Sequence, residues 1–449
     1  MMKKLIVITL ALAILCLSCK KEKDSFNDYV SSVKVVPTEN ALRFKVETVK
    51  TKECSPKVQV RIKGTDKWQT MPGEMAVLLY PETEYECRVV IGELAGEPVV
   101  FSTGALPEEV PVYDLILDKG GPADGYVLQW KESDPGYITF CDPLGKVVWY
   151  DTFEGGVRCA DYNPKTGLIC ALTGSVLIDG CLRPRPATNI TVLDLFGKRH
   201  SSIETAEVKT KYPHHELRWI SDDNMILVDH TCHTIDLSSI DLSAEEKVWG
   251  DNVTVIDMQG NVIWDWDVLE HMNVIEAKDY LPMNQLYDVI HMNSADIDSE
   301  GNYYASLHSI QEIWKIDGIT GEVLYKLGPH GDITVEGGIP SGGYHSIVVL
   351  SPDRFLVNNN SANMSSPTHG ICYEVDAKAK TARITTKVPL AVEYTSTTGG
   401  YFQILSDEMV MFDSGQGKCC AFTDMSGELL RVFTRKDISY RAFYFDKLF

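Results

Sequence analysis

One short pattern recurs six times and constrains the fold more than any other feature of the sequence. In each copy an Asp opens a turn that usually contains Gly, and a β-prone run follows. Another β-prone run usually precedes the turn, so we interpret each copy as the outer hairpin of a four-stranded sheet. Six such sheets predict a six-bladed β-propeller over residues 108–449. The copies begin at Asp142, Asp194, Asp257, Asp317, Asp376 and Asp424.

A smaller unit precedes the repeats. Residues 31–107 contain short runs of alternating polarity, such as KVQVRIKG and YECRVVIG, separated by turn residues. Alternation with a period of two is typical of half-buried antiparallel strands, so we expect a small N-terminal β-sandwich there. The chain is therefore predicted to be all-β. Helices are expected only in two loops of the propeller, at residues 244–252 and 268–281.

The first residues resemble an export signal. Lys3 and Lys4 precede an apolar run that is short for a membrane span and ends at Ser18 and Cys19. A small residue before a cysteine is typical of bacterial lipoprotein processing, which predicts a signal peptide over residues 1–18, an acylated Cys19 and a tether over residues 19–30. An ordinary signal peptide with an incidental cysteine is the alternative. We expect an exported protein, lipid-anchored to the bacterial cell envelope on its periplasmic or outer-membrane face.

Charge excludes several kinds of partner. The chain has a net charge of −21 at pH 7, which repels nucleic acid and anionic lipid. We therefore expect no nucleic-acid partner and no membrane contact beyond the N-terminal lipid, and an anionic substrate would need a local cluster of donors. In an exported protein some cysteines can pair, and Cys54 with Cys87 is the first candidate because both lie in the N-terminal unit.

Histidines occupy one position in three successive repeats. His215, His291 and His345 each stand eight to ten residues ahead of a turn that leads into an apolar strand. Equivalent positions in a propeller lie at equivalent heights around the axis, so the three imidazoles are expected to converge at the mouth of the central channel. Thr398 and Gly399 take the corresponding place in the last repeat, where a hydroxyl and backbone amides could bind an oxyanion.

These residues admit other interpretations. A single histidine in a β protein is usually a hydrogen-bonded structural residue, and a Gly-Gly turn commonly just enters a strand. Three imidazoles could also hold zinc or iron. We nevertheless expect no metal, because no carboxylate recurs at the matching positions and no CxxC or CxxH spacing follows the predicted signal peptide. A nucleotide cofactor is not expected either, since there is no G-x-x-x-x-G-K-[ST] loop.

Four segments resemble, in order, sequence blocks of the bacterial aryl-sulfate sulfotransferases that do not use the nucleotide donor PAPS. They are YPHHELRW, IHMNSADIDSEGNYYASLHSIQEIWKID, GGYHSIVVLSPDRFLVNNNS and YTSTTGGYFQILSDEMVM. The resemblance covers roughly residues 31–449, because that family also has a small β-sandwich before a six-bladed propeller. It implies a transferase that moves a sulfuryl group from a phenolic sulfate ester to a phenolic acceptor, with ping-pong kinetics through a sulfohistidine and without a cofactor.

The resemblance also implies roles for individual residues. His345 corresponds to the nucleophilic histidine, which precedes a strand that ends in an Asn-containing turn, here Asn358 and Asn359. The remaining family positions map to this chain as follows: His291 and Asn293 in the H-x-N-S block, His215 with His214 as the alternative register, and Thr398 or Thr397 near the last inner strand.

One departure from the family pattern concerns the charge of the site. Where the family has Ser-x-Arg, this chain has Ser306-Leu307-His308, so His308 replaces the basic group that holds the sulfuryl oxygens. Arg is permanently charged, whereas an imidazole is cationic only below a pKa of about 6.5. Arg158, at a similar position in the first repeat, is the candidate for compensating this loss.

Two other function classes remain open from the sequence. A non-catalytic propeller lipoprotein would bind a ligand at the same channel mouth, which is favoured if the change to His308 has abolished activity. A metal-dependent hydrolase or lyase would use the same histidines as ligands. A sulfatase is closer to the first hypothesis, because water would only replace the phenol as acceptor.

Overall fold

β-Strands make up nearly all the regular structure of the computed structural model, which describes residues 24–176, 186–209, 212–277 and 289–449. The all-β prediction is confirmed. The helices of the described residues are short, and none has the length and apolarity to cross a bilayer. They are η1 (Phe26–Asp28), η2 (Thr205–Glu207), η3 (Ser238–Ile240), η4 (Val268–Glu270), α1 (Val274–Ala277) and η6 (Val392–Tyr394). The predicted signal peptide and Cys19 lie outside the described residues.

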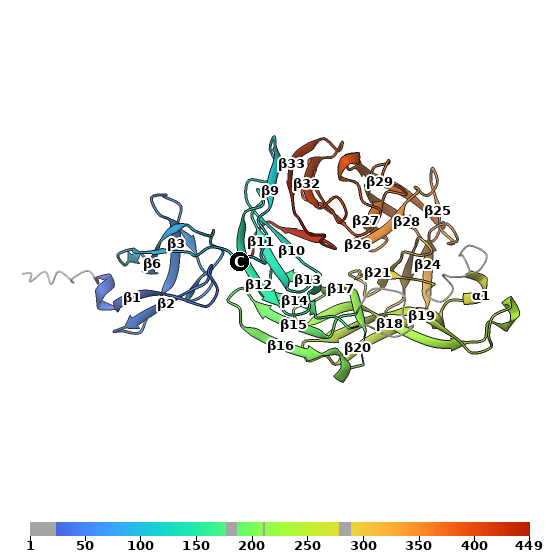
Figure 1. Cartoon of the computed structure of the whole chain (residues 1–449), viewed down its shortest axis with the longest axis horizontal. Coiled ribbons are helices and arrows are strands. Elements are labelled where there is room, and N and C mark those ends of the chain that lie inside the picture. The colour runs from blue at the N-terminus through green and yellow to red at the C-terminus, as the bar shows by residue number, and fades with distance from the viewer. Residues whose placement is uncertain (1–23, 177–185, 210–211, 278–288) are drawn as a thin grey trace, which may run out of the picture.

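The N-terminal strands form two antiparallel sheets, drawn in blue at the left of Figure 1. In β6, Tyr85, Cys87 and Val89 are buried and alternate with more exposed residues, as period-two alternation predicts. One sheet contains β1 (Val30–Pro37), β2 (Phe44–Lys50) and β5 (Met75–Ala76). The other contains β3 (Lys57–Ile62), β4 (Gln69–Thr70), β6 (Glu84–Ile91), β7 (Leu94–Ala95) and β8 (Val99–Ser102).

The predicted disulfide between Cys54 and Cys87 is wrong, since both cysteines are free. Cys87 lies opposite Val60 within the paired strands β6 and β3, and its side chain is fully buried in the core. Cys54 lies in the loop between β2 and β3 and is half-buried. Membership of one small unit was therefore not enough to bring the two sulfur atoms together.

Six further sheets of four or five strands follow along the described chain. In Figure 1 they surround a common centre, and the first strands β13, β17, β21 and β26 lie nearest the middle. The first sheet contains β10 (Tyr126–Trp130), β11 (Gly136–Cys141), β12 (Val147–Phe153) and β34 (Ala442–Phe445). The second contains β13 (Val157–Asn163), β14 (Leu168–Thr173), β15 (Asn189–Asp194) and β16 (Arg199–Glu204). The third contains β17 (Pro213–Trp219), β18 (Asn224–Ile235), β19 (Glu246–Asp257) and β20 (Val262–Asp267).

The remaining three sheets complete this propeller-like arrangement. The fourth contains β21 (Met292–Ile297), β22 (Tyr303–Leu307), β23 (Glu312–Ile316) and β24 (Val323–Leu327). The fifth contains β25 (Thr334–Val335), β26 (Gly343–Ser351), β27 (Arg354–Asn360), β28 (His369–Asp376) and β29 (Thr381–Pro389). The sixth contains β30 (Tyr401–Ile404), β31 (Met409–Ser414), β32 (Cys419–Asp424), β33 (Leu429–Thr434) and β9 (Asp114–Asp118).

The recurring Asp residues have a common structural cause. Each lies at the end of the third strand of its sheet, and its carboxylate accepts backbone N–H groups of the turn that follows. At Asp142 the same oxygen accepts from the amides of Leu144 and Lys146, each at 2.9 Å. The carboxylates of Asp194, Asp257, Asp317, Asp376 and Asp424 accept turn amides in the same way. The predicted outer hairpins are therefore confirmed, and an Asx turn explains why the pattern needs Asp.

Segments far apart in the sequence close the arrangement. β34 pairs antiparallel with β10, with Ala442 opposite Gln129, and so completes the first sheet. β9 pairs with β33 and so completes the sixth. Each of the two sheets thus contains strands from both ends of the propeller-like region, and these pairings fix the last repeat beside the first.

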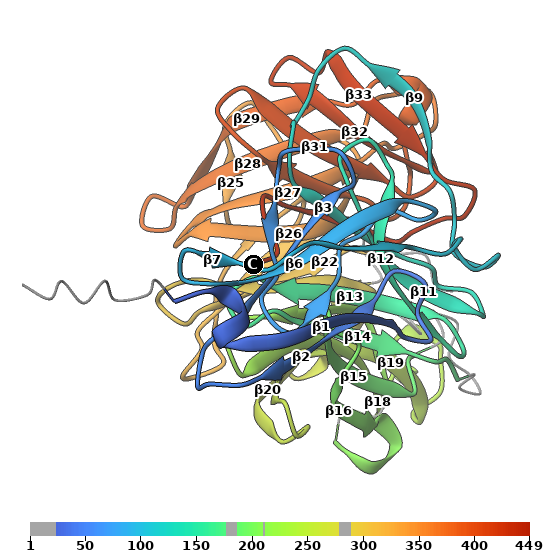
Figure 2. The same cartoon turned by 90° about the vertical axis from the view of Figure 1, so that its left-hand side faces the viewer.

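The N-terminal sheets contact the first two sheets of the ring, in front of which they lie in Figure 2. Arg43 forms a buried ion pair with Asp151 at 2.8 Å and lies 4.8 Å from the ring centroid of Trp149. The Tyr80 hydroxyl donates to the Asp142 carboxylate at 2.9 Å.

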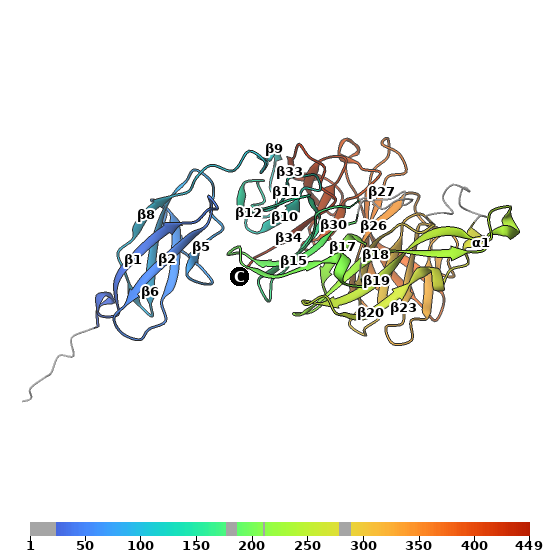
Figure 3. The same ribbon diagram turned by 60° about the horizontal axis from the view of Figure 1, so that its bottom comes forward.

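The helix predicted at residues 244–252 is wrong, because Glu246 onward forms strand β19. β18 and β19 pair over 12 residues each and project on the side away from the N-terminal sheets (Figure 3). The hydrogen bonds with β18 from Glu246 onward outweigh the modest helix propensity of the Ala-Glu-Glu-Lys start of the segment. In the second predicted loop, η4 and α1 form short helices, and residues 278–281 lie outside the described residues.

The closing strand supplies a test of the fold. Phe443 is buried beside Trp130 and Tyr401, with ring centroids at 5.6 and 4.6 Å. We expect Phe443→Ala to lower the free energy of unfolding by about 3 to 5 kcal/mol, because it removes a packed ring from the closing sheet. Phe449→Ala, at an exposed position, is the matched control and should change it by less than about 1 kcal/mol. Urea unfolding followed by tryptophan fluorescence measures both, and equal losses would contradict this account of closure.

Candidate active site

Four histidines from neighbouring sheets form one cluster. His215 comes from β17, His291 directly precedes β21, His308 directly follows β22 and His345 lies on β26. The ring centroids are 4.9 Å apart for His215 and His291, 5.9 Å for His291 and His308, and 4.2 Å for His308 and His345. The structure thus brings together the three histidines of the repeat alignment and the one that replaces the family Arg.

A repeated β-bulge aims these side chains. The pairing register shifts between His214 and Leu217 in β17, between Met292 and Ser294 in β21, and between His345 and Ile347 in β26. His215, His291 and Ser346 have left-handed backbones, with φ of 54°, 46° and 63°. Such angles are uncommon outside glycine and collect at functional sites, and bulges re-aim side chains next to active sites.

His345 is a neutral imidazole in this environment. Only 3% of the residue is exposed, and burial is the main reason that its pKa lies well below 6.5. The nearby imidazoles of His308 and His291 and the guanidinium of Arg441 lower this pKa further, because a second positive charge is disfavoured there. Within the described residues, Nδ1 of His345 has no hydrogen-bond partner. A neutral ring with an uncommitted nitrogen can act as a nucleophile.

The Tyr344 carbonyl orients two neighbours of His345. It accepts from Nδ2 of Asn293 at 3.0 Å and lies 3.2 Å from Nδ1 of His308. The contact with His308 is a hydrogen bond when that nitrogen carries the proton. Asn293 is fully buried, so its amide is held in one direction. The segment that carries His345 thus also fixes the two side chains beside it.

Asn359, Thr397 and Thr398 form contacts at the edge of this cluster. Asn359 donates to the Ser341 carbonyl at 3.1 Å and so ties β27 to the chain that enters β26. The Thr397 hydroxyl donates to Gln416 at 2.8 Å. Thr398 is exposed, in a turn whose Gly400 amide donates to the Tyr440 carbonyl at 2.8 Å.

Arg441 is a permanent cation that acts on two of the histidines. Arg158 lies at the corresponding bulge of β13, but its guanidinium pairs with Glu132 at 3.5 Å. The Arg441 guanidinium is 1% exposed, lowers the pKa of both His215 and His345, and pairs with Glu216 at 2.8 Å. Arg158 and Arg441 thus belong to neighbouring sheets, and the compensating role predicted for Arg158 stays a prediction.

Sequence reasoning missed Arg441, Tyr440, Glu216 and Ser294. The Tyr440 ring lies 4.9 Å from that of His215 and 6.4 Å from that of His345. Tyr440 and Arg441 precede β34, which occupies in the first sheet the place that the histidine-bearing strands occupy in theirs. The repeat position was the available signal, but the first sheet takes this strand from the far end of the chain. Glu216 directly follows His215 in the sequence, and it was overlooked next to the histidine.

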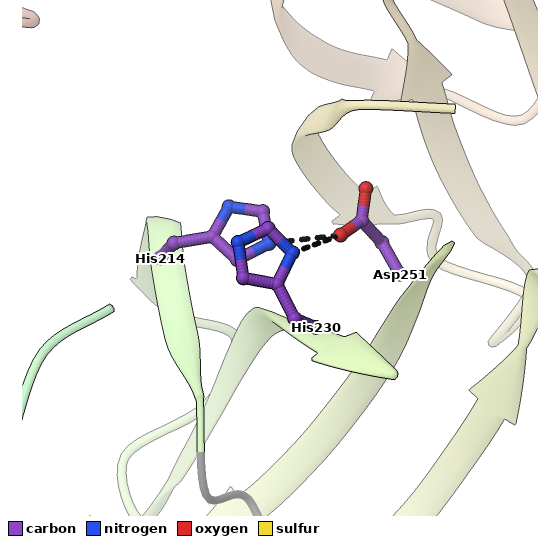
Figure 4. A group of neighbouring side chains, drawn as sticks. All are labelled: His214, His230 and Asp251. Atoms are coloured by element: carbon purple, nitrogen blue, oxygen red, sulfur yellow. Dashed lines mark hydrogen bonds and ion pairs between the residues drawn. The ribbon is translucent and has the colours of Figure 1, made fainter. Parts of the chain in front are cut away.

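His214 belongs to a second, buried group that it forms with His230 and Asp251 (Figure 4), next to the histidine cluster. Its Nε2 lies 3.0 Å from Oδ1 of Asp251, and Nδ1 of His230 lies 2.8 Å from the same oxygen. Three such residues could hold a metal ion by proximity alone. However, the rings of His214 and His230 are stacked, with centroids 3.7 Å apart and planes at 22°. In this arrangement both ring nitrogens lie at hydrogen-bonding distance from the one carboxylate oxygen, which accounts for the group without a metal ion.

A comparison with known families identifies the chain. The sequence profile of the arylsulfotransferase (ASST) family matches residues 187–434. The chain belongs to this family. The match includes the strands that carry His215, His291, His308 and His345, and the family resemblance seen in the sequence is therefore confirmed. No curated protein matches this arylsulfotransferase-family chain.

Several solved structures are similar to this chain at low identity. A protein of unknown function from Bacteroides caccae shares 12% identity, with 72% of this chain and 100% of that chain covered and a TM-score of 0.45. The beta-propeller domain of Cps50 (Swd1) from Myceliophteria thermophila shares 11%, with 71% and 89% covered and a TM-score of 0.41. AztD from Citrobacter koseri shares 9%, with 72% and 99% covered and a TM-score of 0.31. We draw no inference from scores this low.

The neutral state of His345 predicts a pH dependence of stability. Between its native pKa and about 6.5 the unfolded chain binds a proton that the native state does not, so this residue lowers stability as pH falls below 6.5 and contributes nothing further above it. We expect His345→Asn to reduce proton uptake on unfolding by about one at pH 5. Denaturant unfolding from pH 5 to pH 8 measures this. The exposed His330→Asn is the control, and parallel curves for wild type and His345→Asn would show that His345 is not neutral in the native state.

Proposed function

We propose that this protein is an aryl-sulfate sulfotransferase that works without PAPS. It would move a sulfuryl group from a phenolic sulfate ester to a phenolic acceptor through a sulfohistidine at His345. The observation that carries the proposal is the neutral, buried imidazole of His345 within a cluster of donors in a member of the arylsulfotransferase family. In this proposal the six sheets are the blades of a six-bladed propeller, the N-terminal sheets form a sandwich, and the cluster lies at the channel mouth.

The first half-reaction forms the covalent intermediate. A nitrogen lone pair of His345 attacks sulfur, and the bond between sulfur and the aryl oxygen breaks with its electron pair on the phenolate. His291, Asn293 and His308 are the proposed donors to the sulfuryl oxygens. The negative charge of the bound donor favours a protonated His215, which can then give its proton to the leaving oxygen.

The second half-reaction transfers the group to the acceptor. His215 takes the proton of the acceptor phenol, whose oxygen attacks sulfur while the bond to His345 breaks and its electron pair returns to the imidazole. Burial and the neighbouring imidazoles hold the pKa of His215 well below 6.5, so its resting form is the base that this step needs. The protonated His215 then serves as the acid of the next cycle.

The permanent positive charge of the site would come from Arg441. Its guanidinium lowers the pKa of His215 and of His345, while the Glu216 carboxylate balances part of its charge. A cation held there attracts the sulfate ester without the entropy cost of moving a long side chain at the surface. His308 would then supply a directed hydrogen bond more than a charge.

We also propose the location that the N-terminal sequence predicts. The protein would be exported and held on the cell envelope by a lipid on Cys19. Its partners would be small phenols and their sulfate esters, and its negative net charge argues against nucleic acid.

The covalent intermediate supplies the first test. Brief mixing with a chromogenic aryl sulfate and no acceptor should add one sulfuryl group to the wild-type protein, seen as intact mass after an alkaline quench, because an N–S bond is labile to acid. His345→Ala should show neither the adduct nor the burst of released phenol. His330→Ala, an exposed histidine, is the matched control and should behave like wild type. An active His345→Ala protein would rule out this mechanism, and phenol release that does not depend on an added phenol would indicate a sulfatase.

The close approach of Gly343 to His308 supplies a second test. A Cβ at residue 343 would lie 2.7 Å from Cε1 of His308, so Gly343→Ala must displace that ring. We expect turnover to fall, by up to about 100-fold, because a small misplacement of a binding group is costly. The double variant Gly343→Ala/His308→Ala should be no slower than His308→Ala alone. Initial rates of the three variants give this cycle, and losses that multiply would mean that residue 343 acts other than through His308.

A further inference from the structure

We propose that Asp251 is a positioning residue that fixes, through His214, which nitrogen of His215 is free to accept a proton. The inference rests on the proposed role of His215 as the base. Asp251, on β19, does not belong to the histidine cluster itself, and no pattern in the sequence singled it out. It reaches His215 through a chain of hydrogen bonds that runs from β19 to β17.

The Asp251 carboxylate has three hydrogen-bonding contacts. Its Oδ1 lies within hydrogen-bonding distance of His214 and His230, and its Oδ2 accepts from the backbone amide of Met292. Less than a tenth of the residue is exposed in Asp251, His214 and His230 alike. Burial raises the pKa of Asp251, but the imidazoles and their hydrogen bonds outweigh it and hold the pKa well below its usual range. An ionised carboxylate can only accept, so both imidazoles must donate to it.

This acceptor determines the tautomers in turn. Because Nε2 of His214 donates to Asp251 and burial lowers the pKa of His214 to about 4, that ring is neutral and its Nδ1 carries a lone pair. Nδ1 of His215 lies 2.6 Å from Nδ1 of His214. Because the His214 nitrogen is the acceptor, Nδ1 of His215 carries the proton of this hydrogen bond. A neutral His215 then has its only free lone pair at Nε2, on the opposite edge of the ring.

The consequence for transfer is specific to one step. With the lone pair fixed at Nε2, His215 is ready to take the proton of an acceptor phenol without first exchanging tautomers. When it has done so, its positive charge is stabilised through His214 by the charge of Asp251. The same logic orients histidines in hydrolase triads, where an Asp sets the tautomer of the base.

An amide at residue 251 would reverse the direction of the hydrogen bonds that link residue 251, His214 and His215. Asp251→Asn keeps the size of the side chain but offers one acceptor and one donor group. If its oxygen remains on the Met292 amide, its NH2 group donates to Nε2 of His214, which must then carry its proton on Nδ1. His215 would accept at Nδ1 and hold its proton on Nε2, where the phenol must be deprotonated.

The matched control is a histidine–aspartate pair in the same sheet. His233 Nε2 lies 2.7 Å from Oδ2 of Asp267, and the Thr231 hydroxyl donates to the same oxygen. Asp267→Asn makes the same chemical change at a pair that the proposal gives no role. It should leave both half-reactions and the His214 and His215 tautomers as in wild type.

Two readouts test the proposal on the full protein. In two-bond 1H–15N spectra of 15N-histidine-labelled wild type, we expect one neutral ring protonated at Nε2 (His214) and one protonated at Nδ1 (His215), assigned with His214→Gln and His215→Gln, and we expect both to invert in Asp251→Asn. In rapid-mixing assays with an aryl sulfate whose phenolate leaves without needing a proton, Asp251→Asn should sulfate His345 at nearly the wild-type rate but transfer to a phenol of high pKa about 10²- to 10⁴-fold more slowly. The loss should shrink for acceptors of lower pKa and at higher pH, where the phenolate needs no base.

The outcomes separate this inference from the proposed function. Wild-type tautomers other than those stated would overturn the inference without any variant. An Asp251→Asn protein that transfers to the phenol at the wild-type rate would also overturn it. So would an Asp251→Asn protein in which both half-reactions slow equally for every acceptor. If wild type shows the stated tautomers but moves no sulfuryl group, the proposed function fails while the hydrogen-bonded chain stands.

Discussion

The arrangement of the site depends on one buried ion pair. Arg441, just before the strand that completes the first sheet, pairs with Glu216 on the third sheet at 2.8 Å. The Ser294 hydroxyl of the fourth sheet donates to the same carboxylate at 2.7 Å and accepts the Ile347 amide of the fifth at 2.9 Å. One hydrogen-bonded network therefore connects four sheets next to the histidine cluster. Buried ion pairs add little net stability but strongly penalise loss of one partner, so the pair specifies position more than it adds free energy.

In the proposed mechanism, the same pair reconciles two opposed demands on the charge of the site. The sulfate ester is an anion and needs positive charge, whereas the nucleophilic imidazole must remain unprotonated. Arg441 lies close enough to disfavour protonation of His345, and Glu216 keeps the cation from standing uncompensated in the core. The replacement of the family Arg by His308 is easier to accommodate in a protein that already holds a fixed cation.

Much of the fold followed from local chemistry that is visible in the sequence. The six Asp turns are set by side-chain to backbone hydrogen bonds within a few residues, so a repeated Asp was enough to count the hairpins. His215, His291 and His345 could be grouped because each belongs to the first strand of its own repeat. By contrast, Arg441 reaches the cluster by closure between the two ends of the chain, and Asp251 reaches it across a sheet. Cys54 and Cys87 show the reverse error, since two cysteines of one small unit can lie in a loop and in a buried strand without meeting.

The closing strand β34 also determines when the site can assemble. Every histidine of the cluster has been synthesised by residue 345, yet the cation beneath them arrives with Arg441, and the strand that holds it in place is the last one, β34. A chain that lacks this segment would carry the four histidines without the ion pair that fixes their surroundings. Assembly of the site therefore waits for the segment that contains Arg441 and β34, although every histidine of the cluster precedes it in the sequence.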